Sequence, residues 1–152
     1  EWIAFHRKYE NKNAIYHTRM KTHGDIDLTN THPYPVWGFE KGQAGMTPTA
    51  IMHNGILSTG NSKDLSKSDT WHYVRDWIRP LSEKDQAVLF TPQMGALIGQ
   101  HIGSSNKFAL MDAMGNVQII NKSAGINWNE CWMSNTYAWD ARNDQLYPGL
   151  NK

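Results

Sequence analysis

The sequence predicts an α+β fold with mostly antiparallel strands, and three observations lead to this prediction. Short apolar runs of strand length come first, two stretches with helical periodicity follow, and further strand-length runs come last. Strands and helices grouped in this way favour α+β over the strict alternation of a parallel α/β sheet. The 152 residues have the length of one domain, so we assign residues 1–152 to a single domain.

Two strands are expected in the first third of the chain. Residues 14–18 and 49–53 are short and largely apolar, as in a buried strand. Between them, residues 24–48 form a long connection that is rich in Thr, Pro, Gly and Asn. A connection of this length in a compact domain is usually functional or contains a hairpin, and residues 36–39 are a candidate arm of such a hairpin.

The first helix is expected to begin at Ser68. Ser68 is a favourable N-cap, and the acidic Asp69 suits the positive end of the helix dipole. Pro80 is expected to end or kink this helix because it lacks a backbone N–H. A stripe at helical spacing is expected to face the core, and its members are Val74, Trp77, Ile78 and Leu81.

A second helix is expected after Thr91, which is a suitable N-cap. Pro92 fits the first helical position, and Gly103 is the expected end. The residues expected to face inward are Met94, Leu97, Ile98 and Ile102. A hairpin should follow, with strands at 108–112 and 117–121 around a turn at 113–116, and a last strand is expected near 131–134.

The composition excludes several classes of protein. Apolar residues make up 39% of the chain and charged residues 19%, which is too apolar for a disordered chain. The net charge of +1 gives no reason to expect nucleic acid or an anionic membrane surface as a partner. No apolar run approaches the roughly 18 residues that a membrane span needs.

Cys131 is the single cysteine, which excludes an internal disulfide framework and suits a reducing compartment. We therefore expect a cytoplasmic protein. The neighbours Trp132 and Met133 favour an apolar strand, in which the thiol would be inert. In residues 128–139 aromatic and polar side chains alternate, so we expect an aromatic surface there for a protein partner or a homo-oligomer.

Three polar clusters, residues 17–24, 53–55 and 68–70, stand at the ends of predicted elements. The guanidinium of Arg19 can bind a carboxylate through two hydrogen bonds, and Asp69 can accept hydrogen bonds from an ammonium group. The side-chain amide of Asn54 and the backbone N–H of Gly55 are two donors of the kind that an oxyanion hole needs. Together these groups suit an α-amino acid whose side-chain carbonyl is attacked, and glutamine fits that description.

The same clusters carry a family resemblance. The motifs are His17-Thr18-Arg19, Thr22-His23-Gly24, Asn30-Thr31-His32-Pro33, His53-Asn54-Gly55-Ile56 and Ser68-Asp69-Thr70. In this order they resemble the class II glutamine amidotransferases, which are N-terminal-nucleophile hydrolases, and this chain looks like one of their small bacterial or phage versions. The resemblance implies a four-layer αββα sandwich. It also implies a glutaminase or amidotransferase that binds L-glutamine and releases ammonia from its side-chain amide.

The resemblance also implies a role for each matching residue. Arg19 would bind the α-carboxylate of glutamine, with help from Thr22 and the backbone of His23, and Asp69 would bind the α-ammonium group. Asn54 and Gly55 would form the oxyanion hole. His32 and Pro33 would shape their loop. The nucleophile of the family is an N-terminal cysteine, whereas this chain begins with Glu1. We therefore expect the nucleophile and the first strands to be supplied upstream of this chain.

Other interpretations of the same residues remain open. Asn54-Gly55 also suits a type I′ hairpin turn, Arg19 a surface ion pair, and Asp69 a helix start stabilised by its charge. The histidines of the clusters lack the spacing of zinc sites, so we expect structural histidines, no metal and no cofactor. The rival function is a non-catalytic module on the same scaffold, serving as a structural or protein-binding component.

Overall fold

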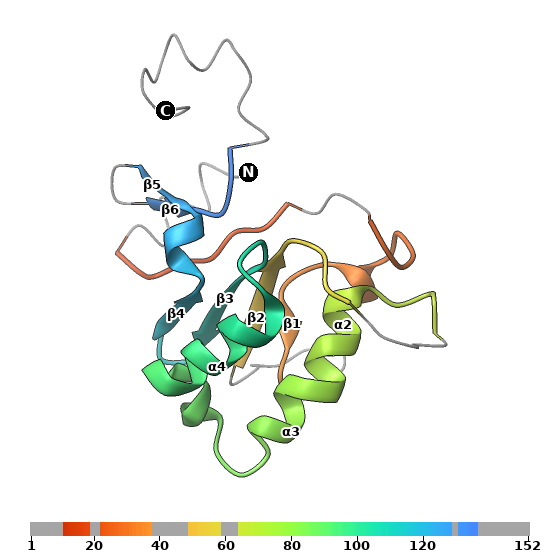
Figure 1. Ribbon diagram of the computed structural model, residues 1–152, viewed down its shortest axis with the longest axis horizontal. Coiled ribbons are helices and arrows are strands. Elements are labelled where there is room, and N and C mark those ends of the chain that lie inside the picture. Colours follow the sequence, from red (N-terminus) through yellow and green to blue (C-terminus); the bar gives the residue numbers. More distant parts are fainter. Residues whose placement is uncertain (1–10, 19–21, 38–48, 59–63, 129–130, 137–152) are drawn as a thin grey trace, which may run out of the picture.

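The computed structural model describes residues 11–18, 22–37, 49–58, 64–128 and 131–136. Within them, a four-stranded antiparallel sheet has the order β1-β2-β3-β4, and β5 and β6 form a separate hairpin (Figure 1). The strands are β1 Tyr34–Pro35, β2 Thr49–Asn54, β3 Lys107–Asp112, β4 Val117–Ile120, β5 Ile126–Trp128 and β6 Cys131–Met133. The mixture of helices and antiparallel strands confirms the predicted α+β class, whereas the four-layer sandwich stays a prediction.

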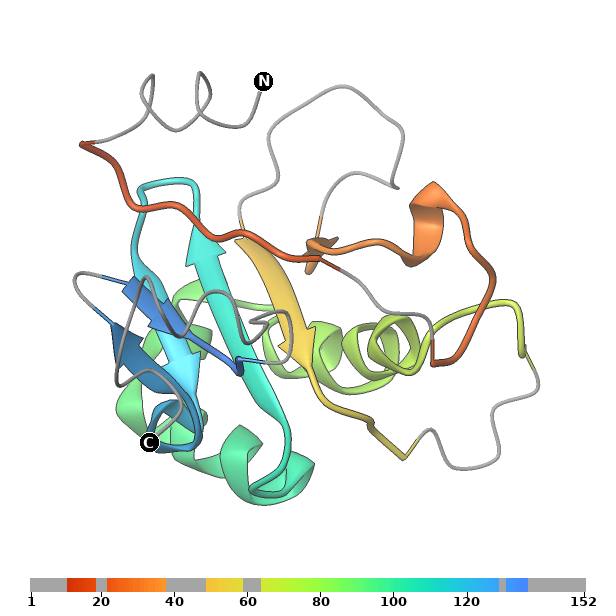
Figure 2. The same ribbon diagram turned by 90° about the horizontal axis from the view of Figure 1, so that it is seen from above.

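The helices form two segments beside the sheet. In the first segment, α2 (Asp69–Tyr73), a π-helical stretch (Val74–Ile78) and α3 (Arg79–Leu81) follow one another without a break. The second is α4, Pro92–Ile102. Short 3-10 helices lie at Leu28–Asn30, Gln86–Phe90 and Lys122–Ala124. Figure 2 shows the helices on one side of the sheet and residues 11–18 crossing its other side.

The core lies between the sheet and the helices. Along β2, the side chains of Thr49, Ile51 and His53 are buried and the residues between them are partly exposed. Ile51 pairs with Leu110 and His53 with Phe108 on β3, which puts both pairs on the buried face. The buried apolar cluster comprises Tyr34, Val36, Ile51, Leu57, Tyr73, Val74, Ile78, Leu89, Ile98, Ile102, Phe108, Leu110 and Ile120.

The predicted helix starts at Ser68 and Thr91 are confirmed by their N-caps. Ser68 Oγ accepts a hydrogen bond from the Trp71 N–H at 3.1 Å, and Thr91 Oγ1 accepts one from the Met94 N–H at 3.3 Å. These bonds satisfy backbone donors that have no partner inside the helix. The predicted end at Gly103 is also confirmed, because Gly103 takes a positive φ of 77° directly after α4.

The predicted apolar stripes are wrong at three positions. Trp77 and Leu97 are 51% and 53% exposed, and Leu81 is exposed as well. In the first helix, the π-helical stretch changes the angular spacing of side chains, so Tyr73 is buried in place of Trp77. In α4, the buried face is narrower than predicted and contains Ile98 and Ile102.

The predicted strand at 14–18 is also wrong. These residues join no sheet in the part of the chain that the structure describes, although the strands predicted at 49–53, in the 108–121 hairpin and near 131–134 are confirmed. The 14–18 segment is held by side chains instead. Asn13 Nδ2 donates to the Gly115 carbonyl at 2.8 Å, and His17 Nε2 donates to the His53 carbonyl at 3.0 Å.

The candidate hairpin arm at 36–39 is described only in part. The N–H of Val36 donates to the Thr49 carbonyl at 3.0 Å, so the pairing of β1 with β2 extends to Val36. Residues 38 and 39 lie outside the described residues. None of the described helices has the length and apolar character that crossing a membrane requires.

Candidate functional site

The predicted polar clusters meet at the end of β2, where the chain passes from His53 to Asn54 and Gly55. The first cluster reaches this point through His17, whose ring bonds the His53 carbonyl. The third reaches it through Asp69, whose Oδ2 accepts a hydrogen bond from the Leu57 N–H at 2.8 Å. Side chains that are far apart in the sequence are therefore gathered around one sheet end.

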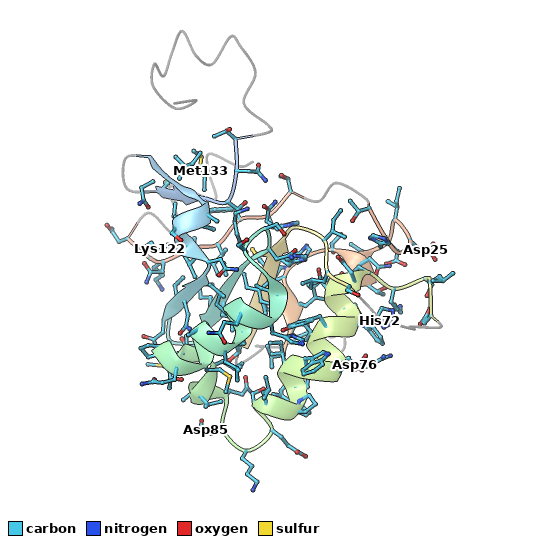
Figure 3. All side chains as sticks on the ribbon, viewed as in Figure 1. Asp25, His72, Asp76, Asp85, Lys122 and Met133 are labelled. Carbon is cyan, nitrogen blue, oxygen red and sulfur yellow. The ribbon has the colours of Figure 1, made fainter. Side chains whose placement is uncertain are left out.

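The loop that contains Thr22 and His23 is attached to the start of α2. Figure 3 shows Asp25 of this loop on the same side of the molecule as His72 of α2, and the Asp25 N–H donates to the Ser66 carbonyl at 2.9 Å. Thr22 and His23 are both exposed. Arg19, the proposed carboxylate-binding residue, lies outside the described residues.

Asn30 fastens this loop from inside. Its side chain is fully buried, with Oδ1 accepting from the Ser68 N–H at 2.7 Å and Nδ2 donating to the Ser66 carbonyl at 2.8 Å. Gly24 has a φ of +75°, and a Cβ at this position would lie 2.7 Å from the Ser68 nitrogen. A side chain at position 24 would therefore separate the two segments, which explains why glycine stands there.

Asn54 and Gly55 adopt a geometry that excludes the hairpin alternative. Residues 55–58 form no strand, and β2 pairs with β1 and β3 instead. Asn54 is half-buried and Gly55 is exposed, with a φ of +139° that side chains rarely allow. A Cβ on Gly55 would lie only 2.9 Å from Asn106 Cγ and closer still to its Oδ1. Glycine is required here by both backbone angle and space.

The Asp69 carboxylate is more buried and accepts more hydrogen bonds than its place at a helix start requires. Its side chain is only 5% exposed. Oδ1 accepts from the Thr70 N–H at 2.8 Å, while Oδ2 holds the Leu57 N–H. A carboxylate has about four acceptor positions, so capacity for a further donor is left over. Asp69 thus anchors the loop after Gly55 as well as starting the helix.

A buried network lies directly behind Asn54. Asn106 Nδ2 donates to the Ile102 carbonyl at 2.6 Å, so its Oδ1 is the acceptor that faces His53 Nε2 at 2.9 Å. His53 Nε2 then carries a proton. Thr70 Oγ1, which has a single proton to donate, lies 2.7 Å from His53 Nδ1 and 3.3 Å from Asp69 Oδ1.

Burial has the largest effect on the pKa of His53, which is 4% exposed. Loss of hydration lowers the pKa of His53 below its ordinary value. The Asn106 hydrogen bond and the charge of Asp69 act in the opposite direction, and the charge of Lys107 adds to the lowering. The net effect keeps the ring neutral near pH 7.

The other cluster histidines pack against one another. The ring centroids of His17 and His32 are 3.9 Å apart, and those of His32 and His53 are 6.5 Å apart. Among the residues that the structure describes, no group of three or more His, Cys, Asp or Glu side chains is arranged to hold a metal ion.

The expectation for Cys131 needs correction, whereas the aromatic surface predicted at 128–139 is described only in part. Cys131 lies on β6 as predicted, but its side chain is exposed, so the expected burial in an apolar environment is wrong. Trp132 is half-buried, and its indole N–H donates to the Lys122 carbonyl at 3.0 Å. The side chain of Trp128 and residues 137–139 lie outside the described part of the chain.

An exposed aromatic surface lies on the helices. The rings of Trp77 and His101 are 4.1 Å apart between centroids, which joins the two helical segments, and exposed Leu97 lies one turn from His101 on α4. Burial raises the pKa of Tyr73 to about 12, so its hydroxyl keeps its proton, and it forms a 2.8 Å hydrogen bond with His101 Nδ1.

An open pocket of about 810 Å³ lies elsewhere, between α4 and β4. Its α4 side contains Gly95, Gly99 and the Gly103 that follows the helix, and its β4 side contains Gln118 and Ile120. None of the predicted site residues lines it. The predicted site residues that the structure describes lie away from this pocket, around the end of β2 and the start of α2.

Sequence reasoning missed three residues that support the site, namely Thr70 as a partner of His53, Asn106 and Lys107. Their partners are far away in the sequence and meet them only through the pairing of β2 with β3 and the packing of α2. Comparison of the chain with known proteins found no matching family model, no matching curated protein and no matching solved structure.

Proposed function

We propose that this chain carries the glutamine site of a class II glutamine amidotransferase-like domain. It binds L-glutamine and, with a cysteine nucleophile supplied upstream of this chain, hydrolyses the side-chain amide to release ammonia. The observation that supports this most is the Leu57–Asp69 hydrogen bond, because it joins the Asn54-Gly55 turn to the predicted ammonium acceptor. The single cysteine of the chain suits a reducing compartment, which favours the cytoplasm.

The residues would act in two stages. Asp69, Arg19 and the loop of Thr22 and His23 would hold the amino acid by its charged end. When the thiolate attacks the side-chain carbonyl carbon, the oxygen becomes an anion, which the Asn54 amide and the Gly55 N–H would stabilise. The amide nitrogen takes up the proton that the thiol has lost, the C–N bond breaks as the C=O bond re-forms, and ammonia leaves. Water then hydrolyses the thioester to glutamate and restores the thiol.

Two measurements test this proposal. Calorimetric titration of this chain with L-glutamine is expected to show binding, with D-glutamine as the matched control of equal composition. The native full-length protein is expected to release ammonia and glutamate from L-glutamine in equal amounts. Absence of ammonia release by the native protein would contradict the proposal, and absence of glutamine binding would contradict the site assigned to this chain.

A specific observation favours the second candidate, a protein-binding module. Trp77 and Leu97 expose large apolar side chains on neighbouring helices, and tryptophan is enriched among the residues that dominate protein interfaces. If this face is an interface, Trp77→Ser should abolish self-association or partner binding in sedimentation experiments. Leu65→Ser, at an exposed leucine outside the helices, is the control.

A further inference from the structure

We propose that Asn106 and Lys107, at the start of β3, are positioning residues for the two oxyanion donors, an inference that rests on the proposed function. Asn106 fixes Gly55, and Lys107 fixes the orientation of the Asn54 amide. Neither residue belongs to the motifs that carry the family resemblance. Both follow α4 in the sequence, although β3 lies beside β2 in the sheet.

Asn106 is held by hydrogen bonds through both its side chain and its backbone. It is 4% exposed, its Nδ2 donates to the Ile102 carbonyl, and its Oδ1 accepts from His53. Its own carbonyl accepts from Asn121 Nδ2 at 2.8 Å. The Asn106 carboxamide is therefore held in one orientation.

Gly55 lies directly beside the Asn106 carboxamide. The space beside its Cα is occupied by the Asn106 carboxamide, so a Cβ would overlap it. Close contact with a rigid group restricts the φ of Gly55, which otherwise is freer than that of any other residue. The N–H of Gly55 is joined to this Cα, so restricted rotation about the N–Cα bond also limits how the N–H can turn before any ligand arrives.

Lys107 acts on the other donor. It pairs with Asn54 in the antiparallel register, so both side chains leave the same face of the sheet. Lys107 Nζ is 3.5 Å from Asn54 Oδ1, at the long end of the hydrogen-bond range. An ammonium group can only donate hydrogen bonds, so it attracts the amide oxygen and repels the amide NH₂.

The contact with Lys107 decides which end of the Asn54 amide faces a ligand. With Oδ1 held toward Lys107, Nδ2 is directed away and can donate to a developing oxyanion. Without the ammonium group, the carboxamide can rotate by half a turn and present its oxygen instead. An oxygen in that position would repel the oxyanion, so the site would lose a donor and gain a repulsive group.

Lys107→Met tests this inference because methionine keeps the length and apolar character of the side chain and removes the charge. We expect kcat for glutamine hydrolysis by the native protein to fall about 10-fold with KM nearly unchanged, since only the transition state carries the oxyanion. Lys107→Arg, which keeps a cationic donor, should retain most of the activity. Lys84→Met, at an exposed lysine before the Gln86–Phe90 turn, is the matched control.

A spectroscopic measurement on this chain separates the inference from the proposed function. The side-chain amide resonances of Asn54 in ¹⁵N NMR should move in Lys107→Met and stay in place in Lys84→Met. Wild-type kcat in Lys107→Met would overturn the inference while glutamine hydrolysis itself stands. If the native protein has no glutaminase activity, the proposed function fails, and unchanged Asn54 resonances in Lys107→Met would overturn the positioning role as well.

Asn106→Ala provides a second, independent variant. A purely structural role for Asn106 would lower the melting temperature and leave kcat per folded molecule unchanged. A positioning role lowers kcat as well, with KM retained. If Asn106→Ala does not fold, Lys107→Met decides the question, since a half-buried lysine at the sheet end is not part of the core.

Discussion

The Asp69 carboxylate accepts a 2.8 Å hydrogen bond from the backbone N–H of Leu57. This bond closes the loop that follows Asn54 and Gly55 against the first turn of α2. Because both groups are buried, neither has water as an alternative partner. The bond therefore links the stability of the fold to the geometry of the candidate site.

Asp69→Asn is expected to lower the free energy of unfolding by about 1–3 kcal/mol. The introduced NH₂ must face either the Leu57 N–H or the Thr70 N–H, and one buried donor is left without an acceptor. Urea unfolding measures the loss, and glutamine titration should show weaker binding. Asp76→Asn is the control, because its exposed pair with Arg75 contributes little. Equal stability of the two variants would contradict the anchoring role.

Gly55→Ala is expected to destabilise the protein more than Gly115→Ala. Both glycines have a positive φ, at +139° and +84°, so both substitutions introduce backbone strain. Only Gly55 has a neighbour, Asn106, in the place of the new Cβ, whereas the space around Gly115 is open. The difference between the two melting temperatures isolates the contact with Asn106. Similar melting temperatures would show that this contact does not matter.

The stability of the fold is expected to fall as the pH drops below the ordinary histidine pKa of about 6.5. Burial lowers the pKa of His53 in the folded state, so the unfolded chain binds the proton more readily. Between the two pKa values the unfolded state takes up more protons, and stability rises with pH. The full contribution of His53 is therefore present above about pH 6.5. Denaturant midpoints from pH 5 to 8 measure this dependence.

His53→Gln serves as the control for that experiment. It should reduce the slope of stability against pH, because it removes the titration of His53 and leaves the other histidines unchanged. An identical slope in the wild type and in His53→Gln would assign the pH dependence to other groups.

Asn54→Ala is expected to reduce kcat by about 10²–10³, or about 2.7–4 kcal/mol, with little effect on glutamine affinity. The reason is that the amide would contact the carbonyl oxygen strongly only when that oxygen is negatively charged. Arg19→Ala is expected to act in the opposite way and weaken binding, because it removes a bidentate contact to the carboxylate. Steady-state kinetics and calorimetry distinguish the two. Equal losses of binding and turnover in both variants would contradict the assigned roles.

Local rules predicted much of the fold. Ser68 and Thr91 were recognised as caps because an N-cap is decided by a hydroxyl and the two or three N–H groups that follow it. β2 and the β3–β4 hairpin were recognised because alternation and turn residues are local as well. Trp77 and Leu97 were misplaced, since helical periodicity gives the angle between side chains but not the register that packing selects.

The sequence by itself determined the inventory of the candidate site: a guanidinium, two carboxamide or amide donors and a carboxylate, each next to an element end. The tertiary structure decided which partners these groups have. Asp69 holds Leu57, and Asn106 supports Gly55, because strand pairing and helix docking bring together residues that are up to 53 positions apart. Such contacts depend on distances in space, and a single sequence carries no record of them.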